Sequence, residues 1–174
     1  MRNWLQLLLA ISLVFSAQAY AGWDANEEQD VRESIAAFKN SDPDMQAFFD
    51  KAWGYAVFPD VGKAGMGIGG AHGAGLVFEQ GEIIGSSKLT QLSFGFQLGA
   101  QLYQEIIFFE KREDLEDFKQ GNFELGAQAS AVAVTLGASA DAAYQDGVAV
   151  FTLAKGGLMY EAAVGGQKFS FEPE

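Results

Sequence analysis

Cysteine is absent from this chain of 174 residues, and histidine occurs once, as His72. Without cysteine no disulfide can form, and no cysteine can carry a lipid anchor behind a leader peptide. One histidine and no cysteine argue against a zinc site, and no serine lies in the G-x-S-x-G pattern expected of a triad that uses His72. The sequence therefore predicts a protein that is not an enzyme and holds no metal or cofactor.

Positive charge is scarce as well. The chain has 11 Lys and Arg against 23 Asp and Glu, which gives a formal net charge of −12. Nucleic-acid phosphates are neutralised by Lys and Arg, so this balance argues against a nucleic-acid partner. It also argues against general attraction to an anionic membrane. Any anion that the protein binds must therefore be held by a local site.

A long apolar run occurs near the N-terminus, at residues 5–15, behind Arg2. Ala17-Gln18-Ala19 and Ala19-Tyr20-Ala21 both have the small-x-small pattern of a cleavage site, and the run is too short to span a bilayer. We expect residues 1–21 to be a secretory signal peptide and residues 22–174 to be a single domain. If the source is bacterial, that domain is periplasmic or secreted. The alternative is that the run forms an apolar first helix of the domain.

Glycine is abundant, with 21 residues, and two glycine-rich stretches resemble each other. Residues 54–75 read GYAVFPDVGKAGMGIGGAHGAG, and residues 147–166 read GVAVFTLAKGGLMYEAAVGG. Both begin with Gly, one residue and Ala-Val-Phe. Both then reach a lysine, Lys63 or Lys155, which is followed by a small residue, Gly and a large apolar residue. We infer two related halves joined and covered by the rest of the chain.

Helical periodicity and capping residues predict three helices. The first covers residues 24–40. The second has Asp42 at its N-cap and Pro43 at its first position, and it ends near Trp53. The third covers residues 111–121 and interrupts the strands.

Alternating apolar residues and turn signals predict a sheet. Turns are expected at Pro59-Asp60, Gln80-Gly81 and Asp146-Gly147. For residues 127–143 periodicity does not decide between helix and strand, and we favour an extended structure. The expected fold is α+β, with two N-terminal helices, one inserted helix and a curved antiparallel sheet, for which an open and a barrel-like form are alternatives. Strands are expected at residues 55–58, 76–79, 82–85, 89–110, 148–155, 158–164 and 167–171.

The glycines after Lys63 fit the G-x-G-x-x-G pattern, but a strand-like HGAGLVFEQG follows where a dinucleotide site needs a helix. A P-loop fails because Ala64 stands where Ser or Thr must hold magnesium. One remaining interpretation is steric, because glycine lets backbone turn tightly or pack closely in a curved sheet. The other is an exposed nest of amides beside Lys63 that binds a head group, with a partner at Lys155 in the same cleft. The candidate head-group residues are Lys63, Gly65, Gly67, Gly69, Gly70, Lys155, Gly156 and Gly157.

Three stretches resemble the SYLF domain family: residues 54–75, residues 101–134 (QLYQEIIFFEKREDLEDFKQGNFELGAQASAVAV) and residues 147–171 (GVAVFTLAKGGLMYEAAVGGQKFSF). The resemblance implies phosphoinositide and membrane binding, and in fungal members actin binding. Eukaryotic members use a basic amphipathic N-terminal segment on the membrane. Here residues 24–33 are acidic, with Arg32 as their basic residue, which argues against docking on an anionic membrane through this helix.

We therefore expect a non-enzymatic lipid-binding protein of the bacterial cell envelope, of the phosphoinositide or phospholipid type. Apolar strand faces would take acyl chains, and the glycine and lysine motifs would take a head group. The alternative is a structural or protein-interaction module, comparable to the actin-binding eukaryotic relatives, which binds an envelope protein through a face that carries Gln97 and Gln101. A third hypothesis is an envelope hydrolase, but the sequence offers no set of acid, base and nucleophile for it.

Overall fold

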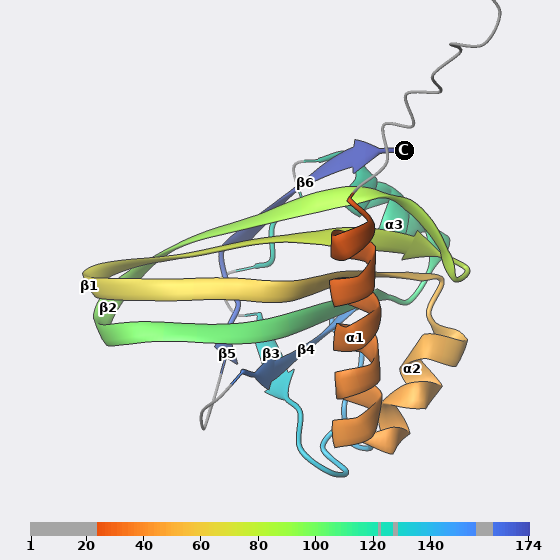
Figure 1. Cartoon of the computed structure of the whole chain (residues 1–174), viewed down its shortest axis with the longest axis horizontal. Coiled ribbons are helices and arrows are strands. Elements are labelled where there is room, and N and C mark those ends of the chain that lie inside the picture. The colour runs from red at the N-terminus through yellow and green to blue at the C-terminus, as the bar shows by residue number, and fades with distance from the viewer. Residues whose placement is uncertain (1–23, 122, 127–128, 156–161) are drawn as a thin grey trace, which may run out of the picture.

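The computed structural model describes residues 24–121, 123–126, 129–155 and 162–174. Its helices are α1 (Ala25–Ser41), the 3₁₀ turn η1 (Pro43–Met45), α2 (Gln46–Lys51) and α3 (Arg112–Lys119) (Figure 1). Asp24 caps α1, since its side chain accepts a hydrogen bond from the Asn26 amide. Asp42 caps η1 in the same way, with Pro43 in the first turn. The three predicted helices are confirmed.

Two long strands dominate the sheet. Strand β1 (Gly54–Glu79) pairs antiparallel with β2 (Glu82–Phe109) from Glu79↔Glu82 to Gly54↔Phe109. The connecting residues Gln80 and Gly81 have positive φ angles of 51° and 90°, as a two-residue hairpin turn requires. The predicted turn at Gln80-Gly81 is therefore confirmed.

The predicted turn at Pro59-Asp60 is wrong, because β1 continues through both residues and through the glycines that follow. The register shifts between Phe58 and Val61, so that β1 carries an extra residue there. Proline has no amide hydrogen to donate, and a bulge is one of the places where a strand tolerates it. The turn signal marks an irregularity within one strand and not the end of a strand.

The β1–β2 ribbon folds back on itself at its far end, on the left of Figure 1, so that two parts of β1 approach each other. Glycines make this approach sterically possible. A Cβ on Gly75 would collide with the carbonyl oxygen of Val57, and one on Gly73 would lie 2.9 Å from the carbonyl oxygen of Asp60. The steric interpretation of the glycines therefore holds for these two positions.

A Gly75→Ala substitution should destabilise the fold by about 2 kcal/mol, because the added methyl group meets backbone that cannot yield locally. Urea unfolding of the variant and the parent measures this difference. Gly62→Ala is the matched control, since no atom lies within 4 Å of a Cβ at Gly62. Equal losses in the two variants would contradict the steric role of Gly75.

The remaining strands complete a mixed sheet. Strand β4 (Val148–Ala154) pairs antiparallel with β2, and β6 (Gln167–Pro173) pairs antiparallel with the other end of β2. Strand β3 (Ser130–Ala133) runs parallel to β4 and pairs antiparallel with β5 (Ala162–Ala163). The α+β class is confirmed, with one parallel pair in an otherwise antiparallel sheet, and the described strands do not close into a barrel.

The two related halves flank the same strand. Residue Phe109 of β2 pairs with Gly54 at the start of β1 and with Val148 at the start of β4. The two Ala-Val-Phe segments therefore lie on the two edges of the same end of β2. For residues 127–143 the described part contains only the short strand β3 followed by turns, and residues 127–128 lie outside the described residues.

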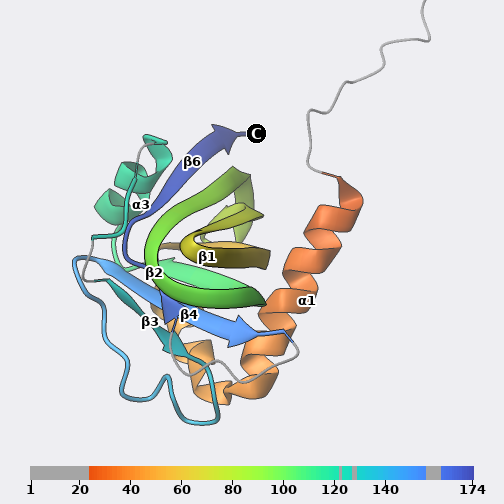
Figure 2. The same ribbon diagram turned by 90° about the vertical axis from the view of Figure 1, so that its left-hand side faces the viewer.

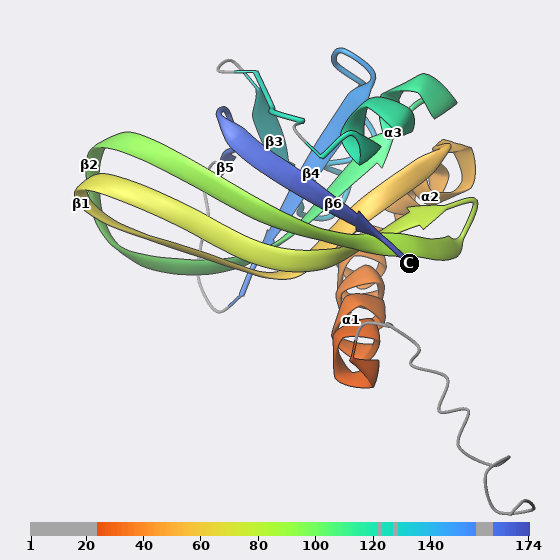
Figure 3. The same cartoon turned by 90° about the horizontal axis from the view of Figure 1, so that it is seen from above.

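Apolar side chains gather on both faces of the sheet. One cluster includes Phe118 of α3 and Phe169 of β6, and the other includes Val31 and Phe38 of α1. Figures 2 and 3 show α1 and α3 on opposite sides of the β1–β2 ribbon, as these two clusters require. Helix α1 thus covers one face of the sheet, and α3 covers the opposite face.

Candidate functional site

Lys63 lies on β1 opposite Gln101 of β2. Side chains alternate along a strand, so Lys63 shares its face of the sheet with Tyr103 and Glu105. The lysine is half-buried, and burial lowers the pKa of its amine, although the Glu105 carboxylate acts in the opposite direction. Lys63 is thus a partly desolvated cation above a buried acid.

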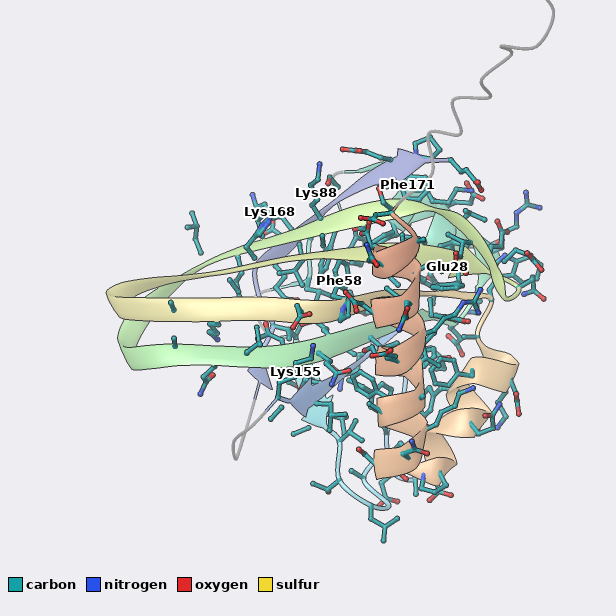
Figure 4. All side chains as sticks on the ribbon, viewed as in Figure 1. Glu28, Phe58, Lys88, Lys155, Lys168 and Phe171 are labelled. Atoms are coloured by element: carbon teal, nitrogen blue, oxygen red, sulfur yellow. The ribbon has the colours of Figure 1, made fainter. Side chains whose placement is uncertain are left out.

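Lys155 follows β4 and lies on the other face of the sheet. Its Nζ is 2.7 Å from Oδ1 of Asp60, and it shares a shallow depression of 240 Å³ with Glu33 and Ser34 of α1. Figure 4 places Lys155 next to α1. The two lysines therefore do not line one cleft. Gly156 and Gly157 lie outside the described residues.

The glycines of the candidate head-group site form part of a strand and not an exposed loop. Gly65, Gly69 and Gly70 pair with Gly99, Ser93 and Leu92 of β2. Consecutive amides of a strand point in alternate directions, so this segment cannot present the converging amides of a nest. Gly67 lies where the register shifts, between Met66 and Ile68. Whether these residues contact a head group stays a prediction.

The far end of the β1–β2 ribbon is free of charge on both strands. Residues 64–78 and 89–104 contain no Asp, Glu, Lys or Arg. Leu92 is 77% exposed and Leu102 is 46% exposed. Strand β6 pairs with β2 as far as Gln91, and β4 pairs with β2 from Tyr103 onward. Neither strand pairs with the part of β2 between these two residues. The bend of the ribbon, where residues 65–70 of β1 pair with residues 92–99 of β2, projects to the left of the helices in Figure 1 and is called the uncharged ribbon end. Leu76, Val77 and Phe78 of the same uncharged interval lie in the buried core.

A polar cluster is buried between β2, β4 and β6. Nε2 of Gln167 donates hydrogen bonds to Glu105 Oε2 at 3.0 Å and to the Tyr103 hydroxyl at 3.3 Å. Burial raises the pKa of Glu105 to about 8, although the Gln167 hydrogen bond and the Lys63 charge act to lower it. At neutral pH this carboxyl group is therefore mostly protonated and uncharged.

The sequence did not reveal this cluster. Glu105 of β2 is buried, whereas Glu110, which follows β2, is exposed. Alternation says nothing about what covers a face, and the cover comes from Gln167, which lies far along the chain. Thr152 of β4 lies directly opposite Glu105, so three strands contribute to the cluster.

Two further observations limit the chemistry. In the part of the chain that the structure describes, no group of three His, Cys, Asp or Glu side chains is placed to hold a metal ion. None of the described helices has the length and apolar character that a membrane crossing requires.

Comparison with known proteins gives two matches. A family model named Ysc84, described as Las17-binding protein actin regulator, matches residues 90–174. Beta cell expansion factor A from Aeromonas veronii is 30% identical over 135 residues, a match that takes in 75% of this chain and 50% of the relative. The chain therefore spans about half the length of the curated relative that it matches. The residues that the family model matches include residues 90–104 of the uncharged part of β2 and the buried polar cluster.

Proposed function

The chain belongs to the SYLF domain family, which is the family of the matching Ysc84 model, and on that premise we propose that it is a non-enzymatic lipid-binding protein. We propose that it works in the bacterial cell envelope. Lipid binding and actin binding are the activities that membership suggests, and the family is generally a binding domain without catalysis. The envelope location rests on the signal peptide predicted at residues 1–21. The contact with lipid is proposed to be the uncharged ribbon end.

The absence of charge at the ribbon end carries this proposal. The chain as a whole has a net charge of −12, which disfavours the approach of most of its surface to an anionic bilayer. Residues 64–78 and 89–104 do not carry this charge, and Leu92 and Leu102 are exposed there. Moving one exposed leucine fully into hydrocarbon contributes about 1.5–3 kcal/mol. Leu92 on the projecting end and Leu102 at its base, opposite Gly62, therefore favour a lipid surface over water.

Lys63 stands at the base of this end and is proposed to meet the head groups. It is half-buried, and no salt bridge is formed by it among the described residues. An anionic phosphate next to a partly desolvated ammonium group offsets the cost of its burial. With Gly65, Gly69 and Gly70 beside it, Lys63 is the part of the predicted head-group site that the proposal retains. Lys155 is paired with Asp60 on the other face and is left out.

Leu92→Asp should weaken the binding of vesicles made of phosphatidylethanolamine and phosphatidylglycerol by about 10-fold or more, because a carboxylate replaces an apolar side chain at the contact. Leu102→Asp should act in the same direction. Co-sedimentation with the vesicles measures the change.

Leu136→Asp is the matched control for the two variants. Leu136 is 82% exposed but lies in the turns after β3, away from the ribbon end. If Leu136→Asp weakens vesicle binding as much as Leu92→Asp does, the ribbon end is not the contact. If none of the three variants binds vesicles more weakly than the parent, the proposed contact through exposed leucines is wrong.

A second candidate is a protein-interaction module. The description of the family model as Las17-binding protein actin regulator favours a protein partner. Gln101 is exposed beside Leu102, so the same end could present amide groups to a protein. Native mass spectrometry of purified protein separates the two candidates, since co-purified lipid is expected for the first and none for the second.

A further inference from the structure

A groove of about 590 Å³ runs along the outer edge of β4, on a part of the molecule that the proposed bilayer contact does not use. Strand β3 pairs with β4 only at Val132↔Phe151 and Ala133↔Thr152, although β4 begins at Val148. The groove lies where β3 parts from β4, because Ser130 and Ala131 pair with β5 and not with β4. Its walls come from residues 123–126, 141–143, 145 and 146. Its volume lies in the range of about 300–1,000 Å³ that is typical of small-molecule sites.

The floor of the groove is apolar and reaches both hydrophobic clusters. Leu125 and Val150 belong to the cluster that contains Phe118, and Phe151 belongs to the cluster that contains Val31. Val132 and Val148 add two more aliphatic side chains to the lining. Leu125, Val150 and Phe151 are at most 6% exposed, so a flexible hydrocarbon chain laid along β4 would leave water mainly against the partly exposed Val132 and Val148. The floor therefore fits an alkyl chain better than a polar ligand.

The rim of the groove is acidic. It carries Glu124, Asp141 and Asp146, and Nζ of Lys168 lies 3.3 Å from Glu124. Asp141 and Asp146 are exposed, and neither forms an ion pair with another described residue. Two carboxylates above an apolar floor attract a cation and repel an anion. The rim therefore opposes an anionic head group, in contrast to the site proposed around Lys63.

We propose that this groove binds a single-chain amphiphile with a cationic amine head, the alkyl chain lying along β4 and the amine lying between Asp141 and Asp146. The inference extends the proposed lipid binding by naming a second site and the class of molecule that it takes. Surface pairs of opposite charge contribute about 0.2–1 kcal/mol each. Two of them give an expected preference of about 5-fold for an amine over a neutral head on the same chain.

Hexadecylamine, hexadecanol and hexadecanoic acid, each below its aggregation threshold, test the proposal on the full chain by titration calorimetry and native mass spectrometry. The amine should bind most tightly, the alcohol about 5-fold more weakly, and the acid most weakly. In the double variant Asp141→Asn with Asp146→Asn, the amine should bind no better than the alcohol. Methyl resonances of Val132 and Val148, the partly exposed aliphatic residues of the lining, should shift on addition of the amine.

The double variant Asp50→Asn with Glu82→Gln removes the same charge away from the groove and should keep the preference for the amine. The proposal is overturned if no amphiphile binds, if the acid binds as well as the amine, or if both double variants lose the preference equally. Leu92→Asp separates the two proposals, since it should lose vesicle binding and keep amine binding. If the protein binds vesicles but not the amine, the groove is not an amphiphile site, and the proposed function still stands.

Discussion

Glu105→Gln should be about 5 kcal/mol more stable than the parent protein at pH 9 and equal to it at pH 4. In the folded protein burial raises the pKa of Glu105 to about 8, from an ordinary value of 4.5. Between these two values the folded state keeps a proton that the unfolded state has released. The free energy of unfolding therefore falls as the pH rises from about 4.5 to about 8, at about 1.4 kcal/mol per pH unit at most, and it levels off above that range. Glutamine cannot ionise, so the variant lacks this loss.

Urea unfolding at several pH values from 4 to 9 measures the effect as the difference between variant and parent, which removes the contributions of the other acids. Glutamine keeps an oxygen that can accept the hydrogen bond from Gln167, so the variant should fold. Glu110→Gln is the matched control directly after the same strand, because Glu110 is exposed. A pH-independent difference between Glu105→Gln and the parent would show that Glu105 does not titrate in this range.

Asp42→Ala should lower the free energy of unfolding by about 3 kcal/mol, because one buried carboxylate holds two distant parts of the chain together. It accepts hydrogen bonds from the amides of Asp44, Gly137 and Ser139, at 3.2, 3.2 and 2.8 Å. Alanine leaves all three donors without this acceptor, two of them in the turns after β3. Urea unfolding measures the loss, and hydrogen exchange should show faster exchange at the amides of Gly137 and Ser139.

The stabilisation by Asp42 depends on its charge. Burial acts to raise the pKa of this carboxyl group, but the hydrogen bonds from Ser139, Gly137 and Asp44 outweigh it, and the pKa lies below the usual 3.8. The contribution is therefore complete above about pH 4 and is lost as the pH falls through the lowered pKa. Asp42→Asn keeps one acceptor oxygen and should lose about half as much as Asp42→Ala. Exposed Asp50→Asn should change stability by less than about 0.5 kcal/mol, and a larger loss there would contradict the special role of Asp42.

The helices could be read from the sequence because their signals are local. Asp24 and Asp42-Pro43 mark the helix starts, and the structure begins α1 and η1 at those places. The hairpin turn at Gln80-Gly81 is local in the same sense. Pro59 gave the wrong result because a proline signal does not distinguish the end of a strand from a bulge, and the outcome depends on the partner strand β2.

The candidate site was less accessible to sequence analysis because it depends on which elements meet. The repeat suggested one cleft for Lys63 and Lys155, yet the two segments lie on either side of β2 and present their lysines to opposite faces. The groove along β4 lies where β3 turns from β4 to β5, and β3 belongs to a stretch where periodicity did not decide between helix and strand. The uncharged ribbon end, in contrast, was present in the sequence as two long intervals without a charged residue.

The pairing of β2 has a consequence for the order in which the protein can assemble during synthesis. One edge of β2 is covered by β1, which precedes it, but the other edge receives β4 and β6, which are made after it. A nascent chain that has reached α3 can already form the ribbon, and it then carries an open strand edge until the C-terminal third has emerged. Such edges invite pairing with other chains. A chaperone that shields the growing polypeptide should therefore matter most in the interval between the completion of β2 and the arrival of β6.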